Sequence, residues 1–234
     1  MQIVSGSSDN SVRVWDVSTG AEVKVLKGHT SSINSVMFSS DSMQIVSGSY
    51  DKSVQVWDVS TGAAVKVLKG HTSWVNSVAF SSDSTQIVSG SDDKSVQVWD
   101  ALTGAEVKVL KGHTRPVKSV TFSNDGMQIV SGSRDRSVQV WDALTGAEVK
   151  VLKSHMDQVN WVGFLDDSMQ IVSGSDDKSV WVWDVLTGAT VKVLKGHTNS
   201  VNSVAFSSNG MQIVSGLDDR SVRVWDMSIG KGPH

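Results

Sequence analysis

The chain has 234 residues, of which 39% are hydrophobic and 19% charged, proportions typical of a globular protein. Its net charge of −3 gives no electrostatic reason to expect nucleic acid or an anionic membrane as a partner. The absence of cysteine excludes disulfides and thiolate metal sites. The sequence shows no signal peptide and no apolar run of membrane-spanning length, so we expect an intracellular, cytoplasmic protein.

A repeat of 42 residues extends through nearly the whole chain. The dipeptide Trp-Asp recurs at this interval six times, and a histidine recurs five times, each 28 residues before the next tryptophan of the series. A fixed period of this length is typical of architectures built from one repeated supersecondary unit. The tryptophans are Trp15, Trp57, Trp99, Trp141, Trp183 and Trp225, and the histidines are His29, His71, His113, His155 and His197.

The predicted elements within one unit are four short strands. In residues 70–111, segments 75–80, 86–90, 95–99 and 105–110 have strand-like patterns and are separated by Ser, Asp, Thr and Gly turn residues. No window predicts an amphipathic helix. The chain divides into a partial unit 1–27, complete units 28–69, 70–111, 112–153 and 154–195, and a partial unit 196–234.

This four-strand unit, with its Gly-His and Trp-Asp marks, resembles the WD-repeat β-propeller family. The resemblance implies one all-β domain, residues 1–234, made of four-stranded antiparallel blades around a central channel. About six blade units are expected, the first and last incomplete. The units are nearly identical, and in this respect the chain resembles the repeat arrays of nucleotide-binding, immunity-like proteins of filamentous fungi.

The resemblance also implies a structural network of four side chains in each complete unit. In the expected arrangement the aspartate bridges the histidine to the serine, and the serine reaches the tryptophan ring nitrogen. These groups offer matching donors and acceptors, as buried polar groups require. The sets are His29, Ser47, Asp51 and Trp57; His71, Ser89, Asp93 and Trp99; His113, Ser131, Asp135 and Trp141; His155, Ser173, Asp177 and Trp183; and His197, Ser215, Asp219 and Trp225.

The same serine, histidine and aspartate invite a hydrolase interpretation. Five copies of one active site in a single domain argue against it, and no oxyanion hole is evident. Histidines in different blades would be too far apart to share a metal, and no phosphate loop or dinucleotide fingerprint appears. We therefore expect no enzyme activity, no cofactor and no metal site.

Partner contacts in this family cluster on the upper rim, beside the first valine of the inner strand and just before the network aspartate. Much of the variation between units falls at these positions. Aromatic and arginine side chains dominate interface energetics, so variation toward them favours a binding rim for a peptide with both charge signs over solvent-exposed drift. The partner-binding candidates are Tyr50, Trp74, Asn76, Asp92, Arg115, Lys118, Arg134, Asn160 and Asp176.

Two further patterns have mainly structural interpretations. Trp161 and Gly163 lie two residues apart on one strand face, which suggests that a large residue is compensated by a small one. Lysines recur in the fourth strand, where they would protect an outer edge from association with other sheets; a nucleic-acid surface is the less favoured interpretation.

The ends leave the closure of the ring open. Six blade units would lack one inner and one outer strand; a five-blade ring could instead use residues 21–26 to finish the last blade. Another copy could complete the unpaired edges by exchange, and a fragment of a longer array also fits. The leading functional hypothesis is a non-catalytic interaction scaffold, with a subunit of an RNA-processing or ubiquitin-ligase assembly and a ligand-sensing repeat domain as alternatives.

Overall fold

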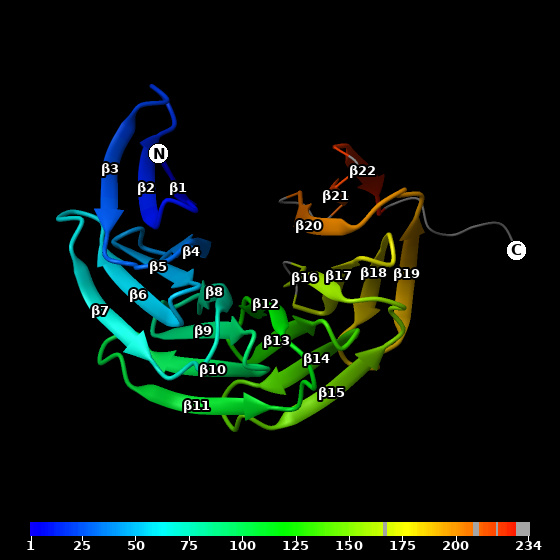
Figure 1. Ribbon diagram of the computed structural model, residues 1–234. Helices are drawn as coiled ribbons and strands as arrows, with labels where there is room; N and C mark the ends of the chain where they lie inside the picture. Colours follow the sequence, from blue (N-terminus) through cyan, green and yellow to red (C-terminus); the bar gives the residue numbers. More distant parts are fainter. Residues whose placement is uncertain (166–167, 208–210, 219, 228–234) are drawn as a thin grey trace, which may run out of the picture.

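The computed structural model describes residues 1–165, 168–207, 211–218 and 220–227. These residues form 22 strands in six antiparallel sheets, and no helix in them could cross a membrane. Strands adjacent in sequence pair with each other, so each sheet is a series of hairpins. The sheets stand side by side around a common centre, first strands innermost where four are present (Figure 1). The prediction of an all-β propeller with incomplete end blades is confirmed.

We number the sheets 1 to 6 in chain order. Sheets 2 to 5 each have four strands, whereas sheets 1 and 6 have three. Sheet 1 contains β1 (Gln2–Gly6), β2 (Ser11–Asp16) and β3 (Glu22–Lys27). Sheet 2 contains β4 (Ile33–Phe38), β5 (Gln44–Ser49), β6 (Ser53–Asp58) and β7 (Ala64–Lys69), and sheet 3 contains β8 (Val75–Phe80), β9 (Gln86–Ser91), β10 (Ser95–Asp100) and β11 (Glu106–Lys111). Sheet 4 contains β12 (Val117–Phe122), β13 (Gln128–Ser133), β14 (Ser137–Asp142) and β15 (Glu148–Lys153). Sheet 5 contains β16 (Val159–Phe164), β17 (Gln170–Ser175), β18 (Ser179–Asp184) and β19 (Thr190–Lys195), and sheet 6 contains β20 (Val201–Phe206), β21 (Gln212–Leu217) and β22 (Val222–Asp226).

The ring is open between sheets 1 and 6 (Figure 1). Strand β3 pairs with β2 over Ser11–Lys27 and Val14–Lys24, so it belongs to sheet 1. The five-blade alternative, in which residues 21–26 complete the last sheet, is therefore wrong. The hairpin to β2 prevails because it is local and has the same register as the corresponding hairpin in every complete sheet.

The hydrophobic core lies between sheets rather than within one. Each of five clusters joins valines and a leucine of one sheet to an isoleucine and a tryptophan of the next. Between sheets 1 and 2, Val12, Val14 and Leu26 pack against Ile45 and Trp57, all at most 1% exposed. Each sheet therefore needs a neighbour on both faces to bury its apolar side chains.

The aspartate of each Trp-Asp pair shapes the turn before the outer strand. In sheet 4, Asp142 Oδ1 accepts hydrogen bonds from Thr145 N and Oγ1, both at 2.7 Å. Gly146 follows with φ of 77°, a left-handed conformation that glycine adopts without strain. Recurrence of Asp-x-x-Thr-Gly thus gives the chain the same tight turn five times.

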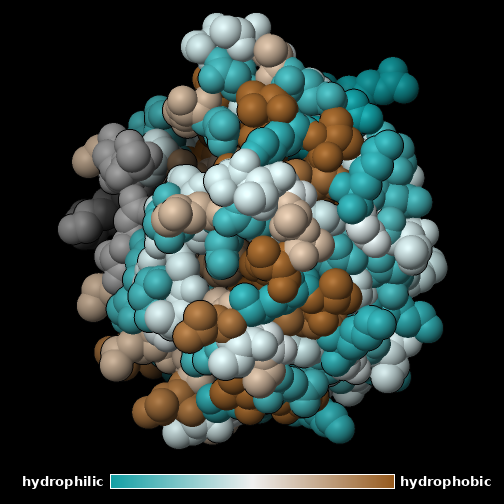
Figure 2. All heavy atoms as spheres, turned by 90° about the vertical axis from the view of Figure 1, so that its left-hand side faces the viewer, coloured by the Kyte–Doolittle hydropathy of each residue, from teal (hydrophilic) through white to brown (hydrophobic). Residues whose placement is uncertain are grey.

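The outer strands present lysines between exposed valines. On the side of the molecule formed by β3 and β7, apolar groups are interrupted by polar ones (Figure 2). Lys24 Nζ also donates a hydrogen bond of 2.6 Å to the Val59 carbonyl of the next sheet, and Lys150 Nζ one of 2.6 Å to the Leu186 carbonyl. These lysines therefore tie adjacent sheets together, a role that the strand pattern did not indicate.

Candidate functional site

A polar network in each complete sheet connects the loop before the inner strand to the third strand. In sheet 4, His113 precedes β12, Ser131 lies on β13, Asp135 lies in the following turn and Trp141 lies on β14. His113 Nδ1 is 2.8 Å from Asp135 Oδ2, and His113 Nε2 is 2.8 Å from Ser131 Oγ. Trp141 Nε1 donates to Ser131 Oγ at 2.9 Å. The imidazole is therefore the bridge, and the expectation that the aspartate bridges histidine to serine is wrong. The carboxylate contacts Nδ1 of the ring, and the serine hydroxyl contacts Nε2 on the opposite side.

The same order of contacts recurs around the ring. In sheets 2, 3 and 5 the histidine–aspartate distances are 2.7 Å and the histidine–serine distances 2.7–2.8 Å. In sheet 6, His197 Nε2 lies 2.6 Å from Ser215 Oγ, which accepts a hydrogen bond from Trp225 Nε1 at 2.8 Å. Asp219 lies outside the described residues.

A second serine, not identified from the sequence, completes the environment of the aspartate. Ser137 Oγ donates to Asp135 Oδ1 at 2.6 Å, and the Thr114 backbone N–H donates to Asp135 Oδ2 at 2.9 Å. Serine two positions after the network aspartate recurs in every repeat, and this recurrence was the signal available in the sequence. The carboxylate thereby fixes the loop that leads into the inner strand.

Hydrogen bonding keeps these aspartates ionised despite their burial. For Asp177, burial alone would raise the pKa, but hydrogen bonds from His155 and Ser179 and attraction to the His155 ring lower the pKa to about 2. The pKa values of Asp51, Asp93 and Asp135 are lowered by the same kinds of contact. At neutral pH each carboxylate can therefore accept several hydrogen bonds at once.

The network serines are inaccessible to a substrate. Ser47, Ser89, Ser131, Ser173 and Ser215 are all 0% exposed, and each is bonded to both an imidazole and an indole. A nucleophile has to reach its substrate. Within the described ranges no group of three His, Cys, Asp or Glu side chains could hold a metal ion.

Two rim aromatics from different repeats meet in space. Tyr50 follows β5 in sheet 2, and Trp74 precedes β8 in sheet 3. Their rings stack with centroids 4.3 Å apart and planes 26° apart, while 46% of the Trp74 residue remains exposed. No other repeat carries an aromatic residue at either position. The result is a partly exposed aromatic platform at the junction of two sheets.

Charged rim residues lie on sheets 3 and 4. Lys118 Nζ is 3.8 Å from Asp92 Oδ1, which also accepts a 2.6 Å hydrogen bond from Asn76 Nδ2. The pKa of Lys118 is lowered, because burial and the nearby charge of Arg134 outweigh the opposite effect of the Asp92 carboxylate. Arg134 and Arg115 are both exposed. This sector thus combines one ammonium group that lies close to a carboxylate with two guanidinium groups that are open to solvent.

The inner-strand rim positions are β-bulges that tie neighbouring sheets together. The pairing of β8 with β9 skips Asn76, and that of β16 with β17 skips Asn160. A bulge redirects its side chain: Asn76 Nδ2 donates to the Val117 carbonyl at 2.8 Å, and Asn160 Nδ2 to the Val201 carbonyl at 3.0 Å. Asn160 also bonds Asp176 at 2.6 Å. These two asparagines therefore have structural partners in addition to their rim position.

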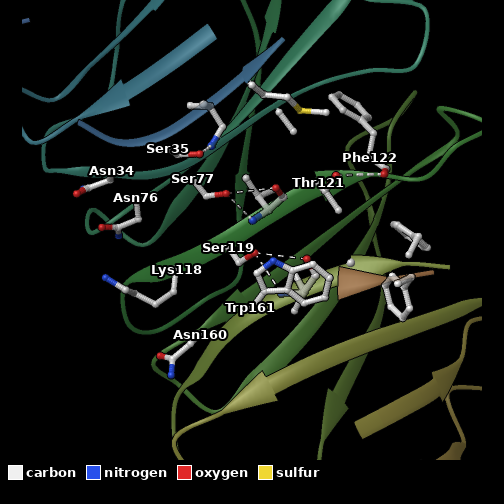
Figure 3. A pocket seen from close by; sticks show the side chains of 18 of the residues that line it. Asn34, Ser35, Asn76, Ser77, Lys118, Ser119, Thr121, Phe122, Asn160 and Trp161 are labelled. Atoms are coloured by element: carbon white, nitrogen blue, oxygen red, sulfur yellow. Dashed lines mark hydrogen bonds between the residues drawn. The ribbon is translucent and has the colours of Figure 1, made fainter. Parts of the chain in front are cut away.

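The inner strands line a central cavity of 510 Å³. Asn34, Asn76, Lys118 and Asn160 lie in a row at one end of it, and the Trp161 indole lies against its wall (Figure 3). A Cβ added to Gly163 would collide with this indole, so the prediction that Gly163 compensates for Trp161 is confirmed.

The repeat also matches a known family model. The model described as WD domain, G-beta repeat matches residues 1–16, 20–58, 62–100, 104–142, 146–184 and 188–226. After the first, each match begins at the turn before an outer strand and ends at the Trp-Asp of the following sheet. The sequence repeat therefore spans two sheets.

Proposed function

Because the chain belongs to the WD40 family, whose repeats generally mediate protein–protein interactions as non-catalytic scaffolds, we propose that its upper rim binds a peptide segment of a partner protein. The stacked Tyr50–Trp74 pair is the observation that carries this proposal. Stacking on Tyr50 alone would favour a more buried ring than that of Trp74, which is 46% exposed at a position where other repeats carry serine, proline or glutamine.

The partner we envisage has an apolar anchor and both charge signs. Its anchor would cover the Tyr50–Trp74 platform, because buried aromatic surface dominates interface energetics. Acidic side chains would face Arg115, Lys118 and Arg134, and basic ones Asp92 and Asp176. Charge complementarity of this kind sets orientation and speeds association.

Rim variants borrowed from the chain's own repeats test the proposal. Trp74→Ser and Arg134→Asp introduce residues found at the same positions of other repeats, so the fold should tolerate them. Peptides selected from a displayed random library on the wild-type chain are expected to bind Trp74→Ser at least about tenfold more weakly, because the platform loses its larger ring. Fluorescence anisotropy measures the affinity.

Leu102→Ser, on the opposite face, is the matched control and should leave the affinity of the rim peptides unchanged. The selected peptides should also lose affinity for Arg134→Asp in proportion to their acidic residues. Full affinity for both rim variants would show that the rim is not the binding surface.

We also propose that this chain self-associates through the two faces at the opening of the ring. Val222 and Val224 are 69% and 62% exposed, whereas the corresponding valines of sheet 2 are 0% exposed. Ile3 is 52% exposed, whereas Ile45 is 0% exposed. In every intact junction the valine face of one sheet packs on the isoleucine face of the next, so the two exposed faces are complementary.

Light scattering after size exclusion tests this second proposal. We expect a mass above the 25.1 kDa of one chain, and a return to one chain in Val224→Lys, which places a charge in the apolar face. A wild-type mass of 25.1 kDa at micromolar concentration would contradict self-association.

The buried network serines support a non-catalytic role, and nothing in the proposal requires a cofactor, nucleic acid or membrane. The same rim would serve a subunit of an RNA-processing or ubiquitin-ligase assembly, or a ligand-sensing domain of an immunity-like protein. We favour the general scaffold, located in the cytoplasm, because the geometry supports peptide binding without specifying a pathway.

A further inference from the structure

Three consecutive sheets expose a leucine on the face opposite the rim. Leu102, Leu144 and Leu186 occupy the turn between third and fourth strands, with 83%, 83% and 85% of the residue exposed. The same turn carries Ser18 in sheet 1 and Ser60 in sheet 2. It keeps the same aspartate–glycine backbone bond of 2.8 Å in all five sheets, so the fold does not require leucine there.

Methionines from a second turn lie beside Leu144 and Leu186, whereas Thr85 occupies the corresponding place beside Leu102. The backbone bonds Ala143 N to Met127 O, at 2.9 Å, and Val185 N to Met169 O, at 2.8 Å, hold the two turns of each sheet together. Met127 and Met169 are 69% and 68% exposed. Leu102, Met127, Leu144, Met169 and Leu186 thus form one set of exposed aliphatic side chains, which we call the leucine arc. Exposed apolar residues gathered on one face typically mark an interaction site.

The charge beside the leucine arc is negative. A hollow of 440 Å³ between sheets 3 and 4 is lined by Met127 and Leu144 together with Asp83, Asp125 and Asp142, and no lysine or arginine lines it. Asp125 Oδ1 is occupied by Ser123 Oγ and Met127 N, and Asp142 Oδ1 by Thr145. The Oδ2 atoms of these two carboxylates accept no hydrogen bond within the described part of the chain.

Hydrogen bonds also lower the pKa of the carboxylates of the hollow, which are ionised at neutral pH. The bond from Ser123 contributes most to lowering the pKa of Asp125, and the bonds from Thr145 lower the pKa of Asp142. The charge of Lys108 acts on Asp142 from the outer strand. Asp83 and Asp125 therefore supply the main unpaired negative charge of the hollow.

We propose that the leucine arc docks a basic amphipathic helix of a partner protein. Leucines on one face of such a helix would cover the arc, as in helix-in-groove recognition. Lysine or arginine stems would lie over Met127 and Leu144, with their charged ends at the carboxylates. Methionine suits this role because its flexible thioether adapts to different partners. The site is separate from the rim and does not depend on rim binding.

Other occupants fit less well. The carboxylates would repel an anionic lipid surface. The described residues of this chain contain no helix, so a second copy could not supply the leucine-and-lysine helix proposed here. A helix rich in leucine and lysine is therefore the occupant that both the apolar arc and its charge favour.

The test uses a labelled synthetic helix of alternating leucine and lysine faces, with binding followed by fluorescence anisotropy. Leu144→Ser is expected to weaken binding about tenfold, and the triple variant Leu102→Ser/Leu144→Ser/Leu186→Ser on the order of a hundredfold. Serine is the residue that sheets 1 and 2 carry there, so these variants should keep their melting temperature. Trp74→Ser, on the rim, is the matched control and should bind the helix as the wild type does.

Charge is tested separately, with a helix in which glutamate replaces lysine and with Asp83→Asn/Asp125→Asn. The glutamate helix should not bind, and the asparagine variant should weaken the lysine helix about tenfold. Unchanged binding of the lysine helix by the triple serine variant would overturn the proposal. Equal binding of the lysine and glutamate helices would also overturn the proposal. So would a preference of the wild-type chain for phosphatidylserine vesicles, if the triple variant no longer bound those vesicles.

Discussion

Replacing His113 with alanine is expected to lower the free energy of unfolding by about 3 kcal/mol. The substitution removes the bridge between Asp135 and Ser131 and leaves a cavity beside Trp141, whose indole lies 6.3 Å from the imidazole between ring centroids. Losing a buried hydrogen-bond partner costs about 1–3 kcal/mol, and the cavity adds to that cost. Urea unfolding followed by tryptophan fluorescence measures the change.

Thr114→Met is the matched control for this variant. Sheet 5 carries Met156 at the same position, and the Met156 backbone N–H makes the bond to Asp177 that Thr114 makes to Asp135. The control should unfold as the wild type does. His113→Ala should still bind rim peptides and the lysine helix below its unfolding midpoint. Lost binding with unchanged stability would show that the histidine acts at a binding surface instead.

The order of bonds in the network shows where sequence reasoning stops. Recurrence at fixed offsets identified His113, Ser131, Asp135 and Trp141 as a group. It could not tell which of two polar groups bridges the others, because that depends on how the loop before β12 enters the sheet. The role of Ser137 was missed although the serine recurs in every repeat, since serine is common in this chain and only the backbone places its hydroxyl against the carboxylate.

The rim shows a similar division. Variation between repeats drew attention to Tyr50 and Trp74 separately, and neither residue indicates in sequence that the other is its neighbour. Their contact follows from the packing of sheet 2 against sheet 3. Asn76 and Asn160 have inter-sheet bonds that depend on a bulge, and a strand pattern of period two does not predict bulges.

The repeat itself explains why the fold was predictable. Four complete units with the same turns and the same apolar positions specify one hairpin series and one way of stacking. Closure was not predictable, because it depends on whether β3 prefers its local hairpin or a distant edge, and both use the same strand pattern. The leucine arc was overlooked because single exposed leucines are ordinary and their alignment on one face appears only in space.

Gly132→Ala is expected to destabilise the chain by about 1–3 kcal/mol, because the added methyl group has no room between sheets 4 and 5. A Cβ at this position would lie 2.7 Å from Val159 Cγ1 and 2.8 Å from Val162 Cγ1. Both valines are at most 2% exposed, and a β-branched side chain has little rotamer freedom with which to move away. Alanine normally stabilises a strand relative to glycine, because the unfolded chain loses less backbone entropy on folding. The destabilisation predicted for Gly132→Ala is therefore opposite in sign to this backbone contribution.

The chain supplies its own control in Gly216→Ala. Gly216 occupies the same place in β21, but no heavy atom lies within 4 Å of an added Cβ, because no described sheet covers that face. Alanine should therefore be neutral there or stabilise by up to about 1 kcal/mol. The double variant Gly132→Ala/Val159→Ala should lose less stability than the sum of the two single variants, since the smaller side chain removes the methyl groups nearest to the added Cβ. If both glycine variants changed the urea midpoint equally, sheet-to-sheet packing would not explain the glycine at this position. The backbone conformation of the strand would then be the reason for it.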